Sequence, residues 1–298
     1  FSRLLLGAAE APFFIIATKI IQQHFTEKRR GLMLSIVNLG PRLATVTAPI
    51  IIVALMLAVG WRGMFVILGL CGFFLAGIWF LVNKKFTDIT SKKEPILANP
   101  IKLKQAFADK NVQLLCIGNF ASSYAYWLFL TWLPYYFMTE KGLNLSEMGL
   151  ATSASFVLSL ISVMLGGIAS DWLVKKNVCV IKSRLMPIII GCLIAVVAML
   201  CIPIIENIYI IISLISISIF ALGLRISPTW ALVADMSCKN SVGTIGGIQN
   251  FANFIGGACA PLVTGFIISY TNDFNIVFIF SALVCLAGTI CYMFIKRK

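Results

Sequence analysis

Long apolar runs, separated by short polar connections, dominate the chain. Runs of roughly 18 to 25 residues recur along its whole length, and this is the length that an α-helix needs to cross a bilayer. The pattern predicts nine spans, at about residues 1–24, 32–59, 62–83, 111–138, 147–171, 184–204, 207–234, 243–270 and 274–295. We therefore expect an all-α fold, a polytopic bundle of membrane-spanning helices.

The composition supports this interpretation. Of the 298 residues, 60% are hydrophobic and 12% are charged, and the mean hydropathy is +0.97. A soluble domain has about 45–50% apolar and about 25% charged residues. We therefore expect an integral membrane protein that has the lipid bilayer as a partner.

The formal net charge of +13 reflects an uneven distribution of the 24 Lys and Arg residues over the predicted connections. Successive connections alternate between the two sides of the membrane, and the basic clusters at 28–30, 84–110, 175–184, 239 and 296–298 all fall on one side. The other side carries only Arg62 and Lys141. By the positive-inside rule the basic side is cytoplasmic. The charge thus predicts topology in a cell inner (plasma) membrane, with the N-terminus outside and the C-terminus cytoplasmic, and no nucleic-acid partner.

The longest polar stretch runs from Lys84 to Lys110 and contains Pro95 and Pro100. Three predicted spans precede it and six follow. We interpret residues 84–110 as a basic cytoplasmic linker between a three-span bundle (1–83) and a six-helix bundle (111–298). A short amphipathic helix is expected near 101–109, at the membrane surface.

Two opposite charges, Arg3 and Glu10, lie inside the first predicted span. Their spacing of seven residues is about two helical turns, so both side chains share one face. Each charge at bilayer depth costs on the order of 3 kcal/mol on insertion scales, which favours placement toward a protein interior or a water-filled cavity. One interpretation is a carboxylate that carries protons beside a cation that binds an anion. The other is a static ion pair.

The sequence offers little other chemistry. The nine cysteines lie mostly within apolar runs and form no C-x-x-C pair, and the single histidine, His24, stands at a predicted helix end. The serine-hydrolase, zinc-protease and phosphate-loop motifs do not occur. We therefore expect no enzyme activity, no metal site and no cofactor.

Several short strings, taken in order, resemble the anion:cation symporter family of the major facilitator superfamily, which includes the carriers for galactonate and glucarate, and sialin. The strings are the basic turn Phe25–Gly31 after the span with Arg3 and Glu10, Gly166–Asp171 as a degenerate copy of the superfamily's loop motif, Ser227–Trp230, Gly243–Gly247, Asn250, Asn253 and Ala260–Pro261. The resemblance covers the whole chain.

The resemblance implies a twelve-helix fold in two halves, each built from inverted three-helix repeats. Because the match begins at the family's fourth helix, we expect the chain to correspond to helices four to twelve, truncated by the N-terminal triplet. The family's fourth helix runs from outside to inside, which agrees with the topology predicted from the charges.

The resemblance also implies roles for individual residues. Glu10 corresponds to a glutamate implicated in proton coupling, and Arg3 to the arginine paired with it. Ser227, Thr229 and Trp230 correspond to substrate-contacting hydroxyls and an aromatic ring. Asn250 corresponds to a substrate-binding amide, whereas Asn253 is expected to be structural. For each of these residues except Glu10 and Arg3, the alternative is ordinary helix packing in a membrane.

Three further polar residues lie deep within predicted spans. Asn119 stands where galactonate-type carriers tend to have Gln, which leaves the identity of the substrate open. Arg42 departs from the family pattern and is a candidate for neutralising a substrate carboxylate, although snorkelling or structural pairing is the equal alternative. For Arg225 the structural role is favoured.

These inferences predict secondary active transport of a small organic anion, a sugar acid or related carboxylate, coupled to protons by alternating access in a monomer. Two alternatives stay open. One is a truncated, non-transporting remnant or partial chain of such a carrier. The other is a carrier for another solute, such as a sugar or a phosphate ester.

Overall fold

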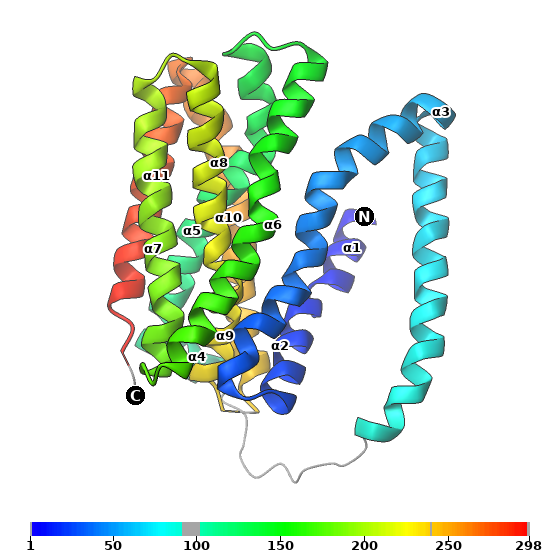
Figure 1. Cartoon of the computed structure of the whole chain (residues 1–298), viewed down its shortest axis with the longest axis vertical. Helices are drawn as coiled ribbons and strands as arrows, with labels where there is room; N and C mark the ends of the chain where they lie inside the picture. Colours follow the sequence, from blue (N-terminus) through cyan, green and yellow to red (C-terminus); the bar gives the residue numbers. More distant parts are fainter. Residues whose placement is uncertain (1, 91–101, 239, 297–298) are drawn as a thin grey trace. The chain divides into compact units, whose positions relative to one another are not determined.

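The computed structural model describes residues 2–90, 102–238 and 240–296, and over these the chain is helical without strands. Some helical residues lack a described side chain, namely 2–3, 49–50, 53, 57, 82–90 and 145. The helices are α1 Ser2–Glu10, α2 Phe13–His24, α3 Glu27–Thr90, α4 Leu103–Ala108, α5 Lys110–Thr139, α6 Leu145–Lys175, α7 Val180–Cys201, the 3-10 turn η1 Ile202–Ile204, α8 Ile208–Leu224, α9 Ile226–Met236, α10 Val242–Thr271 and α11 Phe274–Met293 (Figure 1). The expected all-α membrane fold is confirmed.

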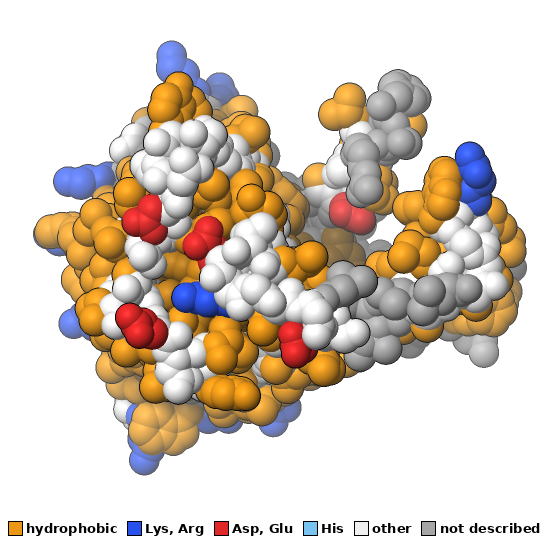
Figure 2. Space-filling view, turned by 90° about the horizontal axis from the view of Figure 1, so that it is seen from above, with side chains coloured by type: hydrophobic (Ala, Val, Ile, Leu, Met, Phe, Trp, Pro, Cys, Tyr) orange, Lys and Arg blue, Asp and Glu red, His pale blue; other side chains and the backbone are white. Residues whose placement is uncertain are grey.

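The chain divides into two compact units, residues 1–43 with 100–298, and residues 44–99. In the first unit α5 packs against α10 and α11, and α8 packs against α6 and α7. Hydrophobic side chains make up much of the surface of this bundle (Figure 2), including strongly exposed Leu262, Phe266 and Tyr270 on α10. Such a surface suits a lipid environment. The predicted division at 1–83, 84–110 and 111–298 stays a prediction.

The second unit contains the later part of α3, which turns at Gly60. This residue has φ 71° and ψ 169°, a conformation that a side chain makes costly. Helix continues on both sides of it, so the chain turns where the predicted spans 32–59 and 62–83 meet. Arg62 covers the ring of Trp61, with the guanidinium carbon 4.4 Å from the ring centre.

Eight helical stretches in the described part of the chain are long and apolar enough to cross a membrane. They are Leu4–His24, Ala58–Leu81, Lys110–Thr139, Ser146–Lys175, Val180–Ile204, Ile208–Met236, Val242–Thr271 and Phe274–Met293. Each corresponds to a predicted span. The remaining predicted span, 32–59, is helical within α3, but several of its side chains lie outside the described residues.

Proline interrupts two of these stretches. Pro12 has no N–H to donate to the carbonyl of Ala8, and the chain passes from α1 to α2 at this point. Pro228 leaves the carbonyl of Leu224 without its usual donor in the same way, and α8 ends at Leu224. The first break immediately follows Glu10, and the second lies beside Arg225, so both breaks occur next to candidate functional residues.

The predicted short helix near 101–109 is confirmed as α4, and a two-residue connection, Asn272–Asp273, joins α10 to α11 between the predicted spans 243–270 and 274–295. Asn272 takes the left-handed conformation that ends α10, with φ 49°. The Asp273 carboxylate then accepts a hydrogen bond from the Asn275 nitrogen at 2.8 Å. This capping starts α11 directly after the residue that ends α10.

Candidate functional site

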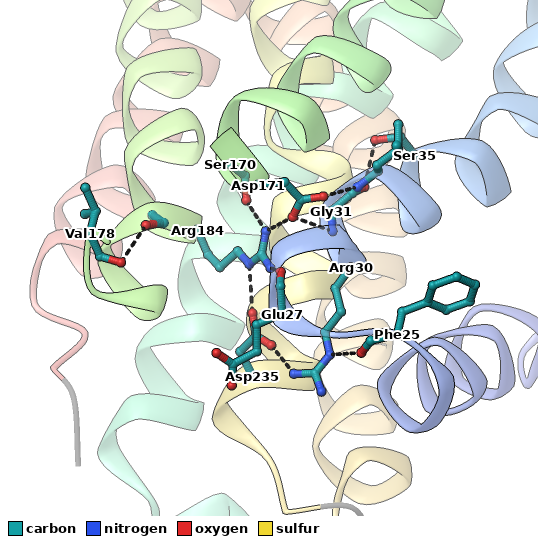
Figure 3. Close-up of polar contacts among 12 residues, drawn as sticks. Phe25, Glu27, Arg30, Gly31, Ser35, Ser170, Asp171, Val178, Arg184 and Asp235 are labelled. Carbon is teal, nitrogen blue, oxygen red and sulfur yellow. Dashed lines mark hydrogen bonds and ion pairs between the residues drawn. The ribbon is translucent and has the colours of Figure 1, made fainter. Parts of the chain in front are cut away.

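Asp171, near the end of α6, joins this helix to the beginning of α3. Its Oδ1 lies 2.9 Å from the backbone nitrogen of Gly31, and its Oδ2 lies 2.8 Å from that of Leu32. The early turns of a helix favour a negative charge because of their N–H groups and the helix dipole. The residue is only 3% exposed. Asp171 therefore holds α3 against α6 inside the protein (Figure 3).

Arg184, near the beginning of α7, connects Asp171 to a second acid. Its Nη1 lies 2.6 Å from Asp171 Oδ1, and its Nε lies 2.8 Å from Asp235 Oδ2. The guanidinium also donates to the Ser170 hydroxyl and to the backbone carbonyl of Glu27 at the start of α3. The Arg184 side chain is completely buried. One cation thus contacts α3, α6 and α9 together.

Arg30, on α3, completes the set from the other side of Asp235. Its Nη1 pairs with Asp235 Oδ1, and its Nη2 donates to the carbonyl of Gln22 at 3.1 Å. These residues lie at the end of the bundle that the charge distribution predicts to be cytoplasmic. We call the following four residues the cytoplasmic charge network: Arg30, Asp171, Arg184 and Asp235.

The cytoplasmic charge network is balanced, with two cations and two anions, and it is largely buried. Buried ion pairs are favourable only when additional hydrogen bonds satisfy the remaining donors and acceptors. Here the backbone of α3 supplies both kinds of partner, amides for Asp171 and a carbonyl for Arg184. Removal of one member would leave an uncompensated buried charge, at a cost of about 3–5 kcal/mol.

Further contacts close the same end of the bundle. The Gln22 side chain at the end of α2 donates to the backbone carbonyls of Ala234 and Ser237, the second at 2.8 Å. Beside it, Ile21 and Leu34 pack with Trp230 and Ala231 of α9 in one buried cluster. Together with the cytoplasmic charge network, these contacts seal α2 and the start of α3 against α9.

A second polar group lies in the middle of the bundle, on α5. The Arg225 guanidinium, between α8 and α9, donates from Nη1 to Asn119 Oδ1 and from Nη2 to Ser123 Oγ, each at 2.9 Å. Asn119 in turn donates to the carbonyl of Gln249 at 3.0 Å, and Ser123 donates to Asn253 Oδ1. Asn119 therefore links α5 to α10 and orients a buried cation.

Arg42 reaches the same helix from α3. Its guanidinium carbon lies 4.1 Å from the centre of the Tyr126 ring, a cation–π contact. Tyr126 follows Asn119 and Ser123 at i+7 and i+3, so the three residues share one face of α5. The structure thus brings Arg42 to the polar face of α5, near the contacts of Arg225.

The Ser-Pro-Thr-Trp string lies at the start of α9 and is buried. The hydroxyls of Ser227 and Thr229 donate to the backbone carbonyls of Val163 and Arg225, at 3.3 and 2.7 Å. The Trp230 ring stacks on that of Phe14 from α2, with ring centres 5.6 Å apart. In this arrangement the two hydroxyls pack within the bundle, whereas Trp230 faces the N-terminal helices.

Asn250 brings α10 to the break between α1 and α2. Its side-chain nitrogen lies 3.4 Å from the carbonyl of Ala11, the residue directly after Glu10. Glu10 itself is exposed, and the side chain of Arg3 lies outside the described residues. The expected pairing of Arg3 with Glu10 therefore stays a prediction, while Asn250 and Trp230 contact Ala11 and Phe14, in the segment after Glu10.

Of the four residues in this network, the Gly166–Asp171 string indicates Asp171. In the sequence analysis, Arg30 and Arg184 serve only to predict the topology, and Asp235 is not identified as a candidate. The positions of Asp235 and Arg184 in the sequence nevertheless indicate that they could pair. Asp235 stands at the end of one apolar span and Arg184 at the start of another, on the same predicted side. Opposite charges at neighbouring helix ends are candidates for an inter-helix pair.

Comparison with known proteins gives a consistent result. The sequence pattern of the Major Facilitator Superfamily matches residues 1–261. The chain is 30% identical to the "Probable L-galactonate transporter" of Escherichia coli, over 99% of this chain and 68% of the relative. It is 27% identical to the "Probable galactarate/D-glucarate transporter GarP" of Escherichia coli, over 99% of this chain and 71% of that one.

Among solved structures, the fold is similar to that of the fucose:proton symporter FucP of Escherichia coli. The TM-score is 0.70 and the sequence identity 14%, with 98% of this chain and 74% of the other covered. At 14% sequence identity, this similarity shows a shared fold and no more. Against these three proteins, the chain spans about two thirds to three quarters of their length.

Proposed function

The chain belongs to the Major Facilitator Superfamily, and on that premise we propose that it carries a sugar acid across the inner (plasma) membrane together with protons. As a member of this superfamily it is a transporter and not an enzyme. The observation that carries the proposed substrate class is the similarity over nearly the whole chain to relatives named for galactonate, galactarate and glucarate. Coupling to protons and action as a monomer are part of the proposal.

The closed end of the bundle supports an alternating-access mechanism. In such a mechanism a central site opens to one side of the membrane at a time. The cytoplasmic charge network and the Gln22 contacts hold α2 and α3 against α9. In the proposed cycle these contacts form when the site faces outward, and they separate when it faces inward.

We assign the binding of the substrate to the region between the N-terminal helices and the α5–α9–α10 group. Asn250 and Trp230 contact the segment after Glu10, and Trp230 would offer its ring face to the carbon chain of the substrate. Hydroxyls and an amide suit the polyol part of a sugar acid, and Arg42 suits its carboxylate. These proposed substrate residues are Arg42, Asn119, Ser227, Thr229, Trp230 and Asn250.

Glu10 is the proposed proton carrier, with Arg3 as its charge partner. It is exposed, lies next to the break at Pro12, and precedes the carbonyl that Asn250 approaches. Protonation there would change the charge beside the proposed substrate residues. This position would let proton binding and substrate binding influence each other.

Transport assays in liposomes test the proposal. The protein expressed from its gene is reconstituted, an inward proton gradient is imposed, and uptake of labelled galactonate, galactarate and galactose is followed. We expect gradient-dependent uptake of an acid, inhibited by unlabelled sugar acid and not by galactose. Galactose uptake that carboxylates do not inhibit would overturn the anion assignment, and folded protein that transports none of the three would support the non-transporting alternative.

A further inference from the structure

Arg225 is a buried cation whose contacts within the described part of the chain are all neutral. It is 5% exposed, and its Nη1 and Nη2 donate to the amide oxygen of Asn119 and the hydroxyl of Ser123. The ion pairs among the described residues involve only Arg30, Arg184, Asp171 and Asp235. The positive charge of Arg225 is thus oriented but not neutralised by them.

Arg225 also keeps one donor free. Its Nε is buried and has no hydrogen-bond partner among the described residues. An unsatisfied donor on a buried charged group is costly, which is why such groups ordinarily have partners. The hydroxyl of Tyr126, two turns along α5 from Asn119, is buried and unpartnered in the same way. Two polar groups near this face of α5 therefore lack a partner.

Arg42 supplies a second cation to the same place. It rests on the ring of Tyr126, which shares one face of α5 with Asn119 and Ser123, the two residues that accept from Arg225. Ser123 and Tyr126, which contact the two guanidiniums, are three residues apart on α5, a rise of about 5 Å. Residues on neighbouring turns of α5 thus contact the two guanidiniums, and neither guanidinium forms an ion pair within the described part of the chain.

The chemistry of this arrangement is specific. A guanidinium presents paired donors that match a carboxylate, and it cannot be discharged by losing a proton. Two such groups held close together repel each other, and a ligand with one negative charge compensates only one of them. A ligand with a carboxylate at each end compensates both.

We propose that Arg42 and Arg225 form a two-guanidinium site that selects a sugar diacid, with a carboxylate at each end of its carbon chain, over a sugar acid with one carboxylate. Asn119 and Ser123 are positioning residues that hold Arg225, and Tyr126 positions Arg42. This inference rests on the proposed function and narrows its substrate class, because the relatives are named for both kinds of acid.

Binding measurements on the purified protein test the site. Galactarate, galactonate and galactose are the diacid, monoacid and neutral probes, and affinity is taken from titration calorimetry with ligand-induced thermal stabilisation as a second readout. The unsubstituted protein should bind galactarate about tenfold or more tightly than galactonate, since hydrogen bonds to charged groups are worth about that factor. Arg42→Gln and Arg225→Gln should each weaken galactarate about 10- to 100-fold and remove most of the preference.

Two control variants test whether the effect is specific to Arg42 and Arg225 and whether it depends on their charge. Arg62→Gln removes an exposed cation that also covers an aromatic ring, and it should leave both affinities unchanged. Arg225→Lys keeps the charge and should retain more affinity for galactarate than Arg225→Gln. If Arg225→Gln does not fold, the test relies on Arg42→Gln. Arg42 is only half-buried, so its replacement should disturb folding less.

The outcomes separate the inference from the proposed function. Equal or tighter binding of galactonate than of galactarate, or an unchanged preference in Arg42→Gln, overturns the two-guanidinium site while sugar-acid transport stands. Failure of the folded protein to bind or transport either acid overturns both.

Discussion

Replacing Asp171 by Asn should open the predicted cytoplasmic end of the transporter. The substitution keeps the size of the side chain but removes its charge, and its amide nitrogen cannot accept a hydrogen bond. Asp171 accepts from two α3 amides, at 2.9 and 2.8 Å, and from Arg184 at 2.6 Å. At least one of these three contacts is lost, and the others are no longer charge-assisted.

The size of the effect follows from these contacts. A hydrogen bond to a charged group is worth about 1.5–3 kcal/mol, and one left unmade costs its desolvation as well. The α3 dipole contributes about 0.3–1 kcal/mol more. Because the contacts with Gly31 and Leu32 join two helices that separate in the proposed cycle, about 2–4 kcal/mol should act on the conformational equilibrium. This corresponds to a shift of about 30- to 700-fold toward the inward-open state.

Distances between spin labels measure that shift. Labels at Gln23, at the end of α2, and at Lys175, at the end of α6, occupy exposed positions on the two sides of the seal. Pulsed electron–electron resonance should give mainly a short distance for the otherwise unsubstituted protein, and a longer population should appear or dominate in Asp171→Asn.

Asp273→Asn is the matched control for this experiment. Asp273 also caps a helix with its carboxylate, but it does so at the opposite end of the bundle and within a single connection. Its distance distribution should equal that of the parent protein. If folded Asp171→Asn also kept the parent distribution, the inference that this carboxylate holds the end closed would be refuted.

Three further substitutions test other parts of the structure. Glu10→Gln should abolish uptake driven by a proton gradient yet spare exchange of labelled for unlabelled substrate, and loss of both or of neither would count against a role in coupling. Gly166→Ala should destabilise the purified protein by about 1–3 kcal/mol, because the new Cβ would lie 2.0 Å from a backbone oxygen of α8. Gly149→Ala, on the same helix, is the control. Its new Cβ meets nothing within 4 Å, and its melting temperature should equal that of the parent protein. Trp230→Ala, which loses the stacking on Phe14, should weaken substrate binding about tenfold or more in calorimetry, while Trp230→Phe should lose less, and an unaffected alanine variant would remove Trp230 from the site.

The helices could be predicted from the sequence because each span is a local property. Length and hydropathy within one segment suffice to identify a membrane helix, and the structure places helices over every predicted span. The break at Pro12 could also have been predicted from the local sequence, since a proline removes a hydrogen bond to a residue only four positions away. It was not predicted because the apolar run continues across it without interruption.

The contacts between helices depend on information that no single segment carries. Arg30 and Asp235 are 205 positions apart, and Arg225 lies 106 positions from Asn119. Spacing within a helix tells which residues share a face, as with Asn119, Ser123 and Tyr126, but not what that face meets. For this reason the sequence could name Asn119 and Arg42 as separate candidates, and only the three-dimensional arrangement brings their helices together.

The buried and half-buried arginines therefore fall into two classes that look alike in the sequence. Arg30 and Arg184 form ion pairs with Asp171 and Asp235, so the charges of the cytoplasmic charge network neutralise one another. Removing one of these residues should therefore alter the conformation of the protein. Arg42 and Arg225 lie on an aromatic ring and on neutral oxygens. At an effective dielectric constant of about 20, two unit positive charges repel each other by about 3 kcal/mol at about 5 Å and by about 2 kcal/mol at about 10 Å. A bound dianion would reverse the sign of that energy, so removal of either cation should alter ligand affinity before it alters the conformation of the bundle.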